Sequence, residues 1–290
     1  MSSPHWPCLR LARALGGAPR VPFTLADEGG VERRLGSVAE PDLAALAAWP
    51  EAFALTPAGV RLILPPATRD AALASIHQAL RDQGRILAWR NEPYPLRDRE
   101  GGTHGVIERA ASRFWGLLTV GAHCNGHLAD AQGRPTHLWI ARRAATKATD
   151  PGRLDNLVGC GVPLGQGPRE AVVREGWEEA GLLPAQMAGL QAGGVFELDA
   201  DIREGRQVEW LHVYDLALPP DYRPQAIDGE VDEHHCLPVA EALARAAAGE
   251  LTTDASLATL DFGLRHGLLG ADAPALQAAL DRLRVPGLPG

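Results

Sequence analysis

The sequence predicts an α+β protein in which helices pack on a mixed sheet. Strand-like and helix-like hydrophobic segments are mixed along the chain without the strict alternation of a parallel α/β fold. The chain has 290 residues, 46% of them hydrophobic, which is enough for a sizeable core. A change in composition indicates a boundary near residue 120. We therefore expect a smaller α/β accessory domain over residues 1–120 and a second domain over residues 121–290.

Hydrophobic spacing defines the elements expected in the first third of the chain. Leu73, Ile76 and Leu80 recur at helical spacing before Gly84, and glycine is typical of helix ends. The predicted elements, in order, are a helix over residues 5–15, a helix over 66–84, a strand over 85–90 and a helix over 103–118.

A glycine-rich segment dominates the middle of the chain. Residues 155–170 are expected to form a loop of the kind that brings backbone close to a ligand. A helix should follow from Glu170 to Ala180 and end near Gly181. The other predicted elements are strands over residues 136–145, 192–198 and 207–218 and helices over 239–250, 256–269 and 273–284.

The composition argues against several classes of protein. A net charge of −8 disfavours a nucleic-acid binder, because phosphate contacts need a basic face. No hydrophobic run approaches the roughly 20 residues that span a membrane. The cysteines occur singly and without a CxxC pair, which argues against a zinc site and a disulfide scaffold and favours a reducing, cytoplasmic setting. They are Cys8, Cys124, Cys160 and Cys236.

Three carboxylates occur together near the end of the expected helix. Glu175, Glu178 and Glu179 share one helix face because they are related as i, i+3 and i+4. A solvated acidic face is the alternative interpretation. However, the C-terminal end of a helix disfavours anions, and Gly176 weakens the helix by about 1 kcal/mol. A hard cation such as Mg²⁺, which prefers oxygen ligands, explains the cluster better.

The same stretch resembles a known motif. Residues 174–182, REGWEEAGL, resemble the second half of the Nudix box, G-x5-E-x7-R-E-U-x-E-E-x-G-U, where U is aliphatic. The chain departs from the pattern at Cys160, Gln166 and Gly176. The resemblance implies an α/β/α sandwich with a mixed sheet and a magnesium cofactor, with manganese as the alternative.

The resemblance also implies roles for individual residues. Glu178 and Glu179 would be metal ligands, and Glu175 would be a ligand or would help to activate water. Arg174 would orient the glutamates through ion pairs. The backbone carbonyl of Cys160 would be a further ligand, because that position binds metal through its carbonyl in the family.

Segments between residues 88 and 267 resemble one Nudix subfamily more closely. Its members carry an extra N-terminal domain, and some are fused to thiamine pyrophosphokinase. The subfamily is associated with hydrolysis of thiamine diphosphate analogues to monophosphates. The resemblance therefore implies a small-molecule diphosphate as the substrate.

Several polar residues outside the box are further candidates. Glu230 is expected to add a catalytic carboxylate, with Asp228 as the competing neighbour and a plain Asp-Gly turn as the alternative. Basic residues just before the glycine-rich segment are expected to face the phosphates or to lie on a solvated strand edge. Two residues at its start are expected to shape the loop or to contact substrate. The three basic residues are Arg142, Arg143 and Lys147, and the two at the start of the segment are Asp155 and Asn156.

Three functions are consistent with these residues. The leading one is Mg²⁺-dependent hydrolysis of thiamine diphosphate or its oxidised analogues. The second is the same reaction on ADP-ribose or another nucleoside diphosphate derivative. The third is a non-catalytic Nudix-fold binding module, which Cys160 and Gln166 motivate and the three glutamates oppose. We expect a monomer or homodimer with no nucleic-acid or membrane partner.

Overall fold

The computed structural model describes residues 5–288, and its centre is a seven-stranded mixed sheet. The strand order is β11-β12-β7-β8-β13, with β10 beside β7 and β9 beside β8. β7 and β12 are parallel, whereas the other pairs are antiparallel, which confirms the predicted α+β class. The strands are β7 (Leu118–Ala129), β8 (Pro135–Arg143), β9 (Leu154–Asn156), β10 (Val158–Gly161), β11 (Gln191–Ile202), β12 (Gly205–Ala217) and β13 (Val231–Pro238).

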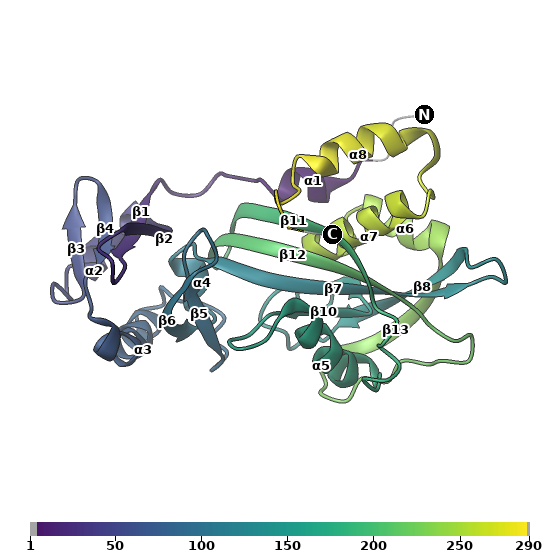
Figure 1. Cartoon of the computed structure of the whole chain (residues 1–290), viewed down its shortest axis with the longest axis horizontal. Helices are drawn as coiled ribbons and strands as arrows, with labels where there is room; N and C mark the ends of the chain where they lie inside the picture. Colours follow the sequence, from purple (N-terminus) through teal and green to yellow (C-terminus); the bar gives the residue numbers. More distant parts are fainter. Residues whose placement is uncertain (1–4, 289–290) are drawn as a thin grey trace.

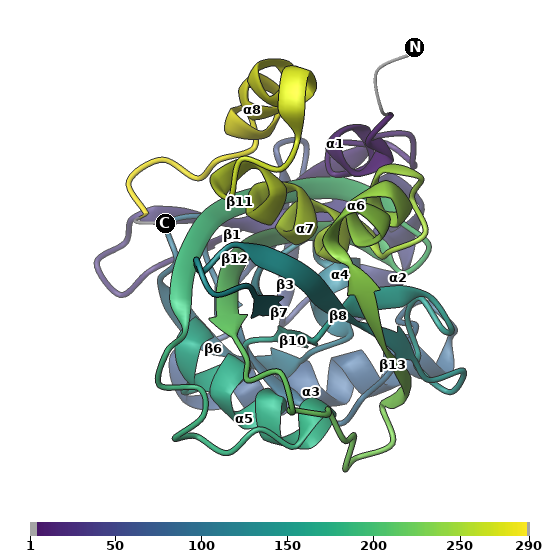
Figure 2. The ribbon, with the colours of Figure 1, turned by 90° about the vertical axis from the view of Figure 1, so that its right-hand side faces the viewer.

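Helices cover both faces of this sheet (Figures 1 and 2). One face carries α5 (Pro168–Ala180), which shares a core with Val120 and Ala122 of β7. The other face carries the C-terminal helices around the buried α7. The predicted sandwich is therefore confirmed. The C-terminal elements are α6 (Val239–Ala247), α7 (Thr253–Arg265), the short turn η2 (Gly270–Asp272) and α8 (Ala273–Asp281).

A second sheet lies in the N-terminal part of the chain, with strand order β2-β1-β4-β3 (Figure 1). Its core includes Phe23, Phe53 and Trp115, and the rings of Phe23 and Trp115 stack with centroids 4.4 Å apart. A separate two-stranded sheet pairs β5 with β6. The elements of this N-terminal region are β1 (Arg20–Ala26), β2 (Glu32–Ala39), η1 (Glu40–Asp42), α2 (Leu43–Leu46), β3 (Phe53–Thr56), β4 (Gly59–Leu62), α3 (Pro66–Asp82), β5 (Pro93–Arg97), β6 (Thr103–Glu108) and α4 (Ala111–Phe114).

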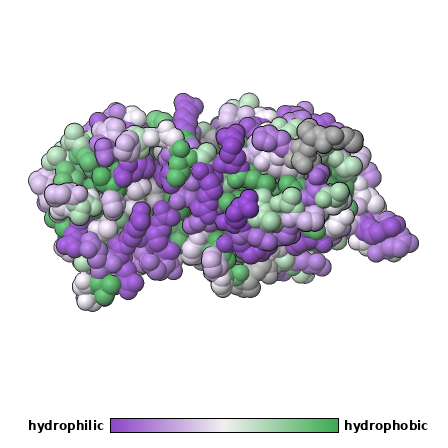
Figure 3. Space-filling view, turned by 90° about the horizontal axis from the view of Figure 1, so that it is seen from above, coloured by the Kyte–Doolittle hydropathy of each residue, from purple (hydrophilic) through white to green (hydrophobic). Residues whose placement is uncertain are grey.

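The first helix, α1 (Pro7–Leu11), packs away from this N-terminal sheet. Trp6 and Cys8 are buried in the same core as α7, so the start of the chain contributes to the large sandwich before it crosses to β1 (Figure 1). The boundary near residue 120 stays a prediction. Among residues 5–288, no helix is both long and apolar enough to cross a membrane. On the face shown in Figure 3, hydrophobic residues are interspersed with hydrophilic ones.

Two predicted elements in the first third are wrong. Residues 85–90 form no strand, because Ala88 takes a left-handed backbone conformation with φ of 56°. Residues 103–118 are not one helix: β6 pairs with β5, and only the short α4 is helical. Thr103, Val106 and Ile107 are β-branched and favour the strand once a partner is present. The helices predicted over 66–84 and at the C-terminus are confirmed.

The glycine-rich segment is also more regular than expected. Residues 154–161 form β9 and β10, and only the part that follows, up to Gly167, is irregular. β10 pairs with β7 through Gly159 and Gly161, where glycine permits close approach. A Cβ atom at Gly161 would lie 2.0 Å from the Tyr94 hydroxyl oxygen. The glycines therefore let the N-terminal region touch this edge of the sheet.

Candidate active site

Helix α5 presents the glutamates of the box because both of its ends are fixed. The Glu170 carboxylate accepts a hydrogen bond from the Gly167 N–H at 2.9 Å. At the other end Gly181 has φ of 71°, and its N–H and that of Leu182 donate to the carbonyls of Trp177 and Gly176. Buried Ala171 and its neighbours then direct the opposite helix face toward a cavity.

Gly176, one departure from the box, has a packing reason. A Cβ atom at this position would lie 2.3 Å from the sulfur of Met187, which is fully buried. Glycine at this position lowers the helix propensity but leaves room for the methionine side chain. Gln166, another departure, lies beside Arg174, whose Nε donates to its amide oxygen at 3.4 Å.

A distant loop reaches the carboxylates through the end of α5. The last carbonyls of a helix lack partners within the helix. Here the N–H groups of Ile227 and Gln225 donate to the carbonyls of Glu178 and Ala180, at 2.8 and 3.0 Å. This docking places Asp228 beside the helix. Ligand oxygens of Glu175, Glu178 and Asp228 all lie within 4.8 Å of one another.

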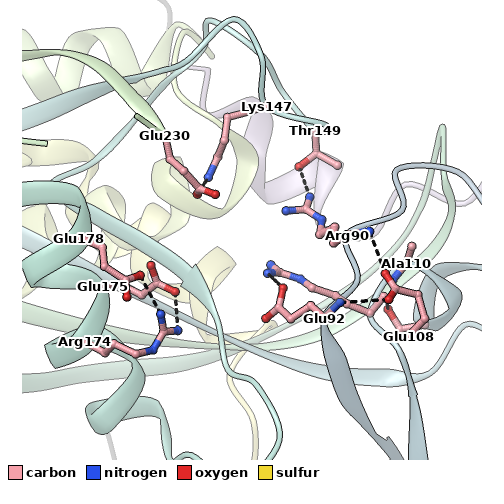
Figure 4. Close-up of polar contacts among 12 residues, drawn as sticks. Arg90, Glu92, Glu108, Ala110, Lys147, Thr149, Arg174, Glu175, Glu178 and Glu230 are labelled. Atoms are coloured by element: carbon pink, nitrogen blue, oxygen red, sulfur yellow. Dashed lines mark hydrogen bonds and ion pairs between the residues drawn. The ribbon is translucent and has the colours of Figure 1, made fainter. Parts of the chain in front are cut away.

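Arg174 holds two of these carboxylates in place (Figure 4). Its guanidinium donates to Glu175 at 2.6 Å and to Glu178 at 2.8 Å. Burial raises the pKa of Glu175 to about 7 despite the opposing charge of Arg174. The predicted orienting contact of Arg174 is thus present in the geometry.

Glu179 points to a different place from the other two glutamates. It is 5% exposed, and its carboxylate accepts a hydrogen bond from the Gly159 N–H at 2.9 Å. Burial, followed by the charge of Glu175, holds the pKa of Glu179 well above its usual range. Glu179 therefore joins α5 to β10. It lines the same cavity but is outside the group formed with Asp228.

The cavity has a volume of about 1340 Å³ and lies between the sandwich and the N-terminal region. Lys147 and Glu230 form an ion pair on its wall (Figure 4). Burial would raise the pKa of Glu230, but the hydrogen bond and charge of Lys147 lower it. Arg143 pairs with Asp155 at 2.8 Å, and both side chains are largely buried. Four predicted residues outside the box therefore line this cavity.

The other two candidates outside the box do not line the cavity. Arg142 donates to the Gly152 carbonyl at 3.0 Å. Asn156 is buried and donates to Asn125 and Thr259, so it belongs to a polar network behind the strand. Cys160 lies in β10 and lines the cavity, and the role of its carbonyl as a ligand stays a prediction.

Residues from the N-terminal region complete the opposite wall. The sequence reasoning missed these, as it missed the importance of Asp228, because they come from elements far apart in the chain and share no spacing with the box. They include Glu92, Tyr94, Arg109 and Arg113, together with Glu209 of β12.

The carboxylate group fits a hard divalent cation. Glu175, Glu178 and Asp228 offer only oxygen ligands, and their oxygens are close enough to share one ion. Mg²⁺ in proteins is typically held by a few carboxylates together with substrate phosphates. These three residues would therefore hold the metal, with Glu179 next to them on the same helix.

The chain is similar in sequence to two plant Nudix hydrolases. Nudix hydrolase 24 (chloroplastic) of Arabidopsis thaliana is 36% identical over 222 residues, which are 76% of this chain and 60% of that protein. Nudix hydrolase 20 (chloroplastic) of the same plant is 34% identical over 226 residues, 77% of this chain and 60% of that protein. The chain thus spans about 60% of the length of either relative.

A crystal structure of a protein from Deinococcus radiodurans has a TM-score of 0.44 and 23% identity, over 65% of this chain and 99% of that one. The NUDIX domain family model matches residues 126–256, a range that includes α5, Asp228 and Glu230. The chain therefore carries a NUDIX domain, which begins in β7 and ends in α7.

Proposed function

We propose that this protein is a Mg²⁺-dependent hydrolase of an organic diphosphate. The observation that carries the proposal is the group of Glu175, Glu178 and Asp228 oxygens on the wall of a large cavity that also contains basic side chains. The NUDIX domain and the two hydrolase relatives support a diphosphate hydrolase.

The reaction adds water across the phosphoric anhydride and breaks one P–O bond. A bound divalent cation would neutralise charge on the phosphate oxygens and orient them for attack. Arg174 keeps Glu175 and Glu178 in the cavity wall through its two ion pairs. The proton of the attacking water goes to a cavity carboxylate, and both Glu175 and Glu230 are available for this.

The substrate class that we propose is thiamine diphosphate or its oxidised analogues. The support is the resemblance of segments between residues 88 and 267 to the subfamily associated with those compounds. ADP-ribose, another organic diphosphate, is the competing substrate. We also propose a cytoplasmic setting, which the four free thiols support.

The test is hydrolysis with Mg²⁺, each substrate with an EDTA control. Phosphate release is measured for thiamine diphosphate, oxythiamine diphosphate and a nucleoside triphosphate. Formation of AMP is measured for ADP-ribose, because both of its phosphates are esterified and its hydrolysis releases no inorganic phosphate. Glu178→Gln serves as the variant that removes a carboxylate of the metal group. Selective, EDTA-sensitive release from the thiamine compounds supports the whole proposal. Hydrolysis of ADP-ribose alone replaces the proposed thiamine substrate class. No hydrolysis of any of the four compounds by folded protein refutes hydrolysis of these compounds and favours a binding module.

A comparison of Glu175→Gln with Glu230→Gln identifies the proton acceptor. Because Glu175 also belongs to the metal group, both variants are compared at saturating Mg²⁺, where the variant with the larger loss of kcat marks the residue that takes the proton. If both variants keep the activity of the wild-type protein, neither carboxylate is the proton acceptor.

A further inference from the structure

Arg90 lies on the cavity wall contributed by the N-terminal region, on an unusual piece of backbone. Ala88, two positions before Arg90, and Asn91, directly after it, have φ of 56° and 59°. Left-handed conformations are uncommon for residues other than glycine. They are strained, so they persist only where the surrounding structure holds them, and they are concentrated at functional sites. This segment is outside residues 126–256, so the NUDIX domain alone does not supply it.

The backbone around Arg90 is held by one carboxylate. Glu108 of β6 accepts hydrogen bonds from the N–H of Arg90 at 2.9 Å, of Glu92 at 3.1 Å and of Ala110 at 3.3 Å (Figure 4). These bonds connect the segment to β6 and offset the strain of the left-handed residues. The direction in which the Arg90 side chain leaves the backbone is therefore fixed before any ligand binds.

The Arg90 guanidinium forms no ion pair within 4 Å among residues 5–288, although the more distant charges of Glu92 and Glu230 act on it. Its one side-chain hydrogen bond goes to the Thr149 hydroxyl at 3.1 Å. Burial, followed by the charge of Arg109, lowers the pKa of Arg90 to about 10. A partly buried guanidinium of this kind gains free energy when an anion arrives.

The other basic side chains on the cavity wall already have partners or full access to water. Arg109, Arg113, Arg143 and Arg174 form ion pairs with carboxylates at 2.6–2.8 Å, and Lys147 is paired with Glu230. Arg153 donates to two backbone carbonyls, and Arg203 is exposed. In the described part of the chain, Arg90 is thus the partly buried cavity cation that contacts neither a carboxylate nor a backbone carbonyl through its guanidinium.

We propose that Arg90 binds a phosphate group of the substrate, on the side of the cavity opposite the metal group. Figure 4 shows Arg90 across an open space from Glu175 and Glu178. Arginine has five N–H donors in a planar fork that matches phosphate oxygens, and only one donor is in use here. This inference rests on the proposed function, since it assigns the second contact of the same diphosphate.

Binding of inorganic pyrophosphate in EDTA, measured by isothermal titration calorimetry, isolates this contact from metal and from turnover. Arg90→Gln is expected to weaken pyrophosphate binding roughly 10- to 150-fold, the range for loss of charged hydrogen bonds. Arg90→Lys should lie between, because it keeps the charge and loses the fork. Arg134→Gln is the matched control, since Arg134 is exposed at the β7–β8 hairpin and paired with Asp130.

Kinetics on the organic diphosphate give an independent readout. Arg90→Gln should raise KM in the same proportion, and Arg90→Lys should recover part of the loss, whereas a purely structural role would lower the thermal midpoint without this recovery. Wild-type pyrophosphate affinity in Arg90→Gln, or no pyrophosphate binding by the wild-type protein, overturns the inference. Arg90-dependent binding without turnover of any organic diphosphate retains the inference and refutes the proposed function.

Discussion

Replacing Glu179 by glutamine tests how much this side chain contributes to the stability of the fold and how much to turnover. The side chain is 5% exposed and its one hydrogen bond comes from the Gly159 N–H at 2.9 Å. Glutamine keeps an oxygen that accepts this bond, and it cannot ionise beside Glu175 as a buried carboxyl group can. It also buries two N–H donors, and one that stays unsatisfied costs about 1–3 kcal/mol. Because the terms oppose one another, we expect a net stability change within about 1 kcal/mol.

Glu179→Ala should behave differently. It leaves the Gly159 N–H without its acceptor, which costs about 1–3 kcal/mol. Both variants should reduce turnover at least roughly a hundredfold. The reason is that Glu179 is a predicted metal ligand, although it lies outside the group formed with Asp228, and loss of a metal ligand removes about 3 kcal/mol of charge stabilisation. The variants therefore separate the structural contribution of this side chain from its catalytic one.

The assays are urea denaturation in EDTA and phosphate release with saturating Mg²⁺. Glu170→Gln is the matched control, since it makes the same chemical change on the same helix at an exposed position that holds the Gly167 N–H. Full activity in Glu179→Gln would refute the assignment of Glu179 to the metal site. A stability loss above about 3 kcal/mol in that variant would refute the hydrogen-bond reasoning.

Two further predictions concern buried ionisable groups and their contributions to the free energy of unfolding. Burial lowers the pKa of His77 to about 3, and its ring accepts a hydrogen bond from the Trp115 indole N–H. The folded state therefore holds His77 neutral, whereas the unfolded chain binds a proton below about pH 6.5. As the pH falls from about 6.5 to about 4.5, the free energy of unfolding should fall by about 2–3 kcal/mol. Chemical denaturation between about pH 4.5 and about pH 6.5 measures this change in the wild-type protein and in His77→Gln. If the free energy of unfolding depends on pH equally in both proteins, the reasoning is wrong. Arg143→Met removes the arginine partner of the buried Asp155 carboxylate, which keeps His123 at 3.4 Å and the Asn156 N–H, and it should cost about 3–5 kcal/mol. Arg142→Met, at an exposed pair, should cost less than about 1 kcal/mol. Equal losses in urea denaturation would contradict this distinction.

Local sequence was sufficient for the helix that carries the carboxylates. Helical spacing puts Glu175, Glu178 and Glu179 on one face, and Gly181 ends the helix through its left-handed conformation. Both properties depend on residues within a few positions of one another. The prediction of a strand over residues 85–90 was wrong for the opposite reason, because the backbone there is held by a distant residue: Glu108 accepts hydrogen bonds from the N–H groups of Arg90 and Glu92.

The sequence by itself determined that an acidic helix follows a glycine-rich segment in a mixed α+β protein. Only the tertiary structure decided that Asp228 joins Glu175 and Glu178, since hydrogen bonds between the end of α5 and a loop almost fifty residues later bring it there. It also placed Arg90 opposite them, from a region outside the NUDIX domain. The physical reason is that spacing constrains residues within one helix or strand, whereas residues from separate elements meet only through packing and hydrogen bonds made when the whole chain folds.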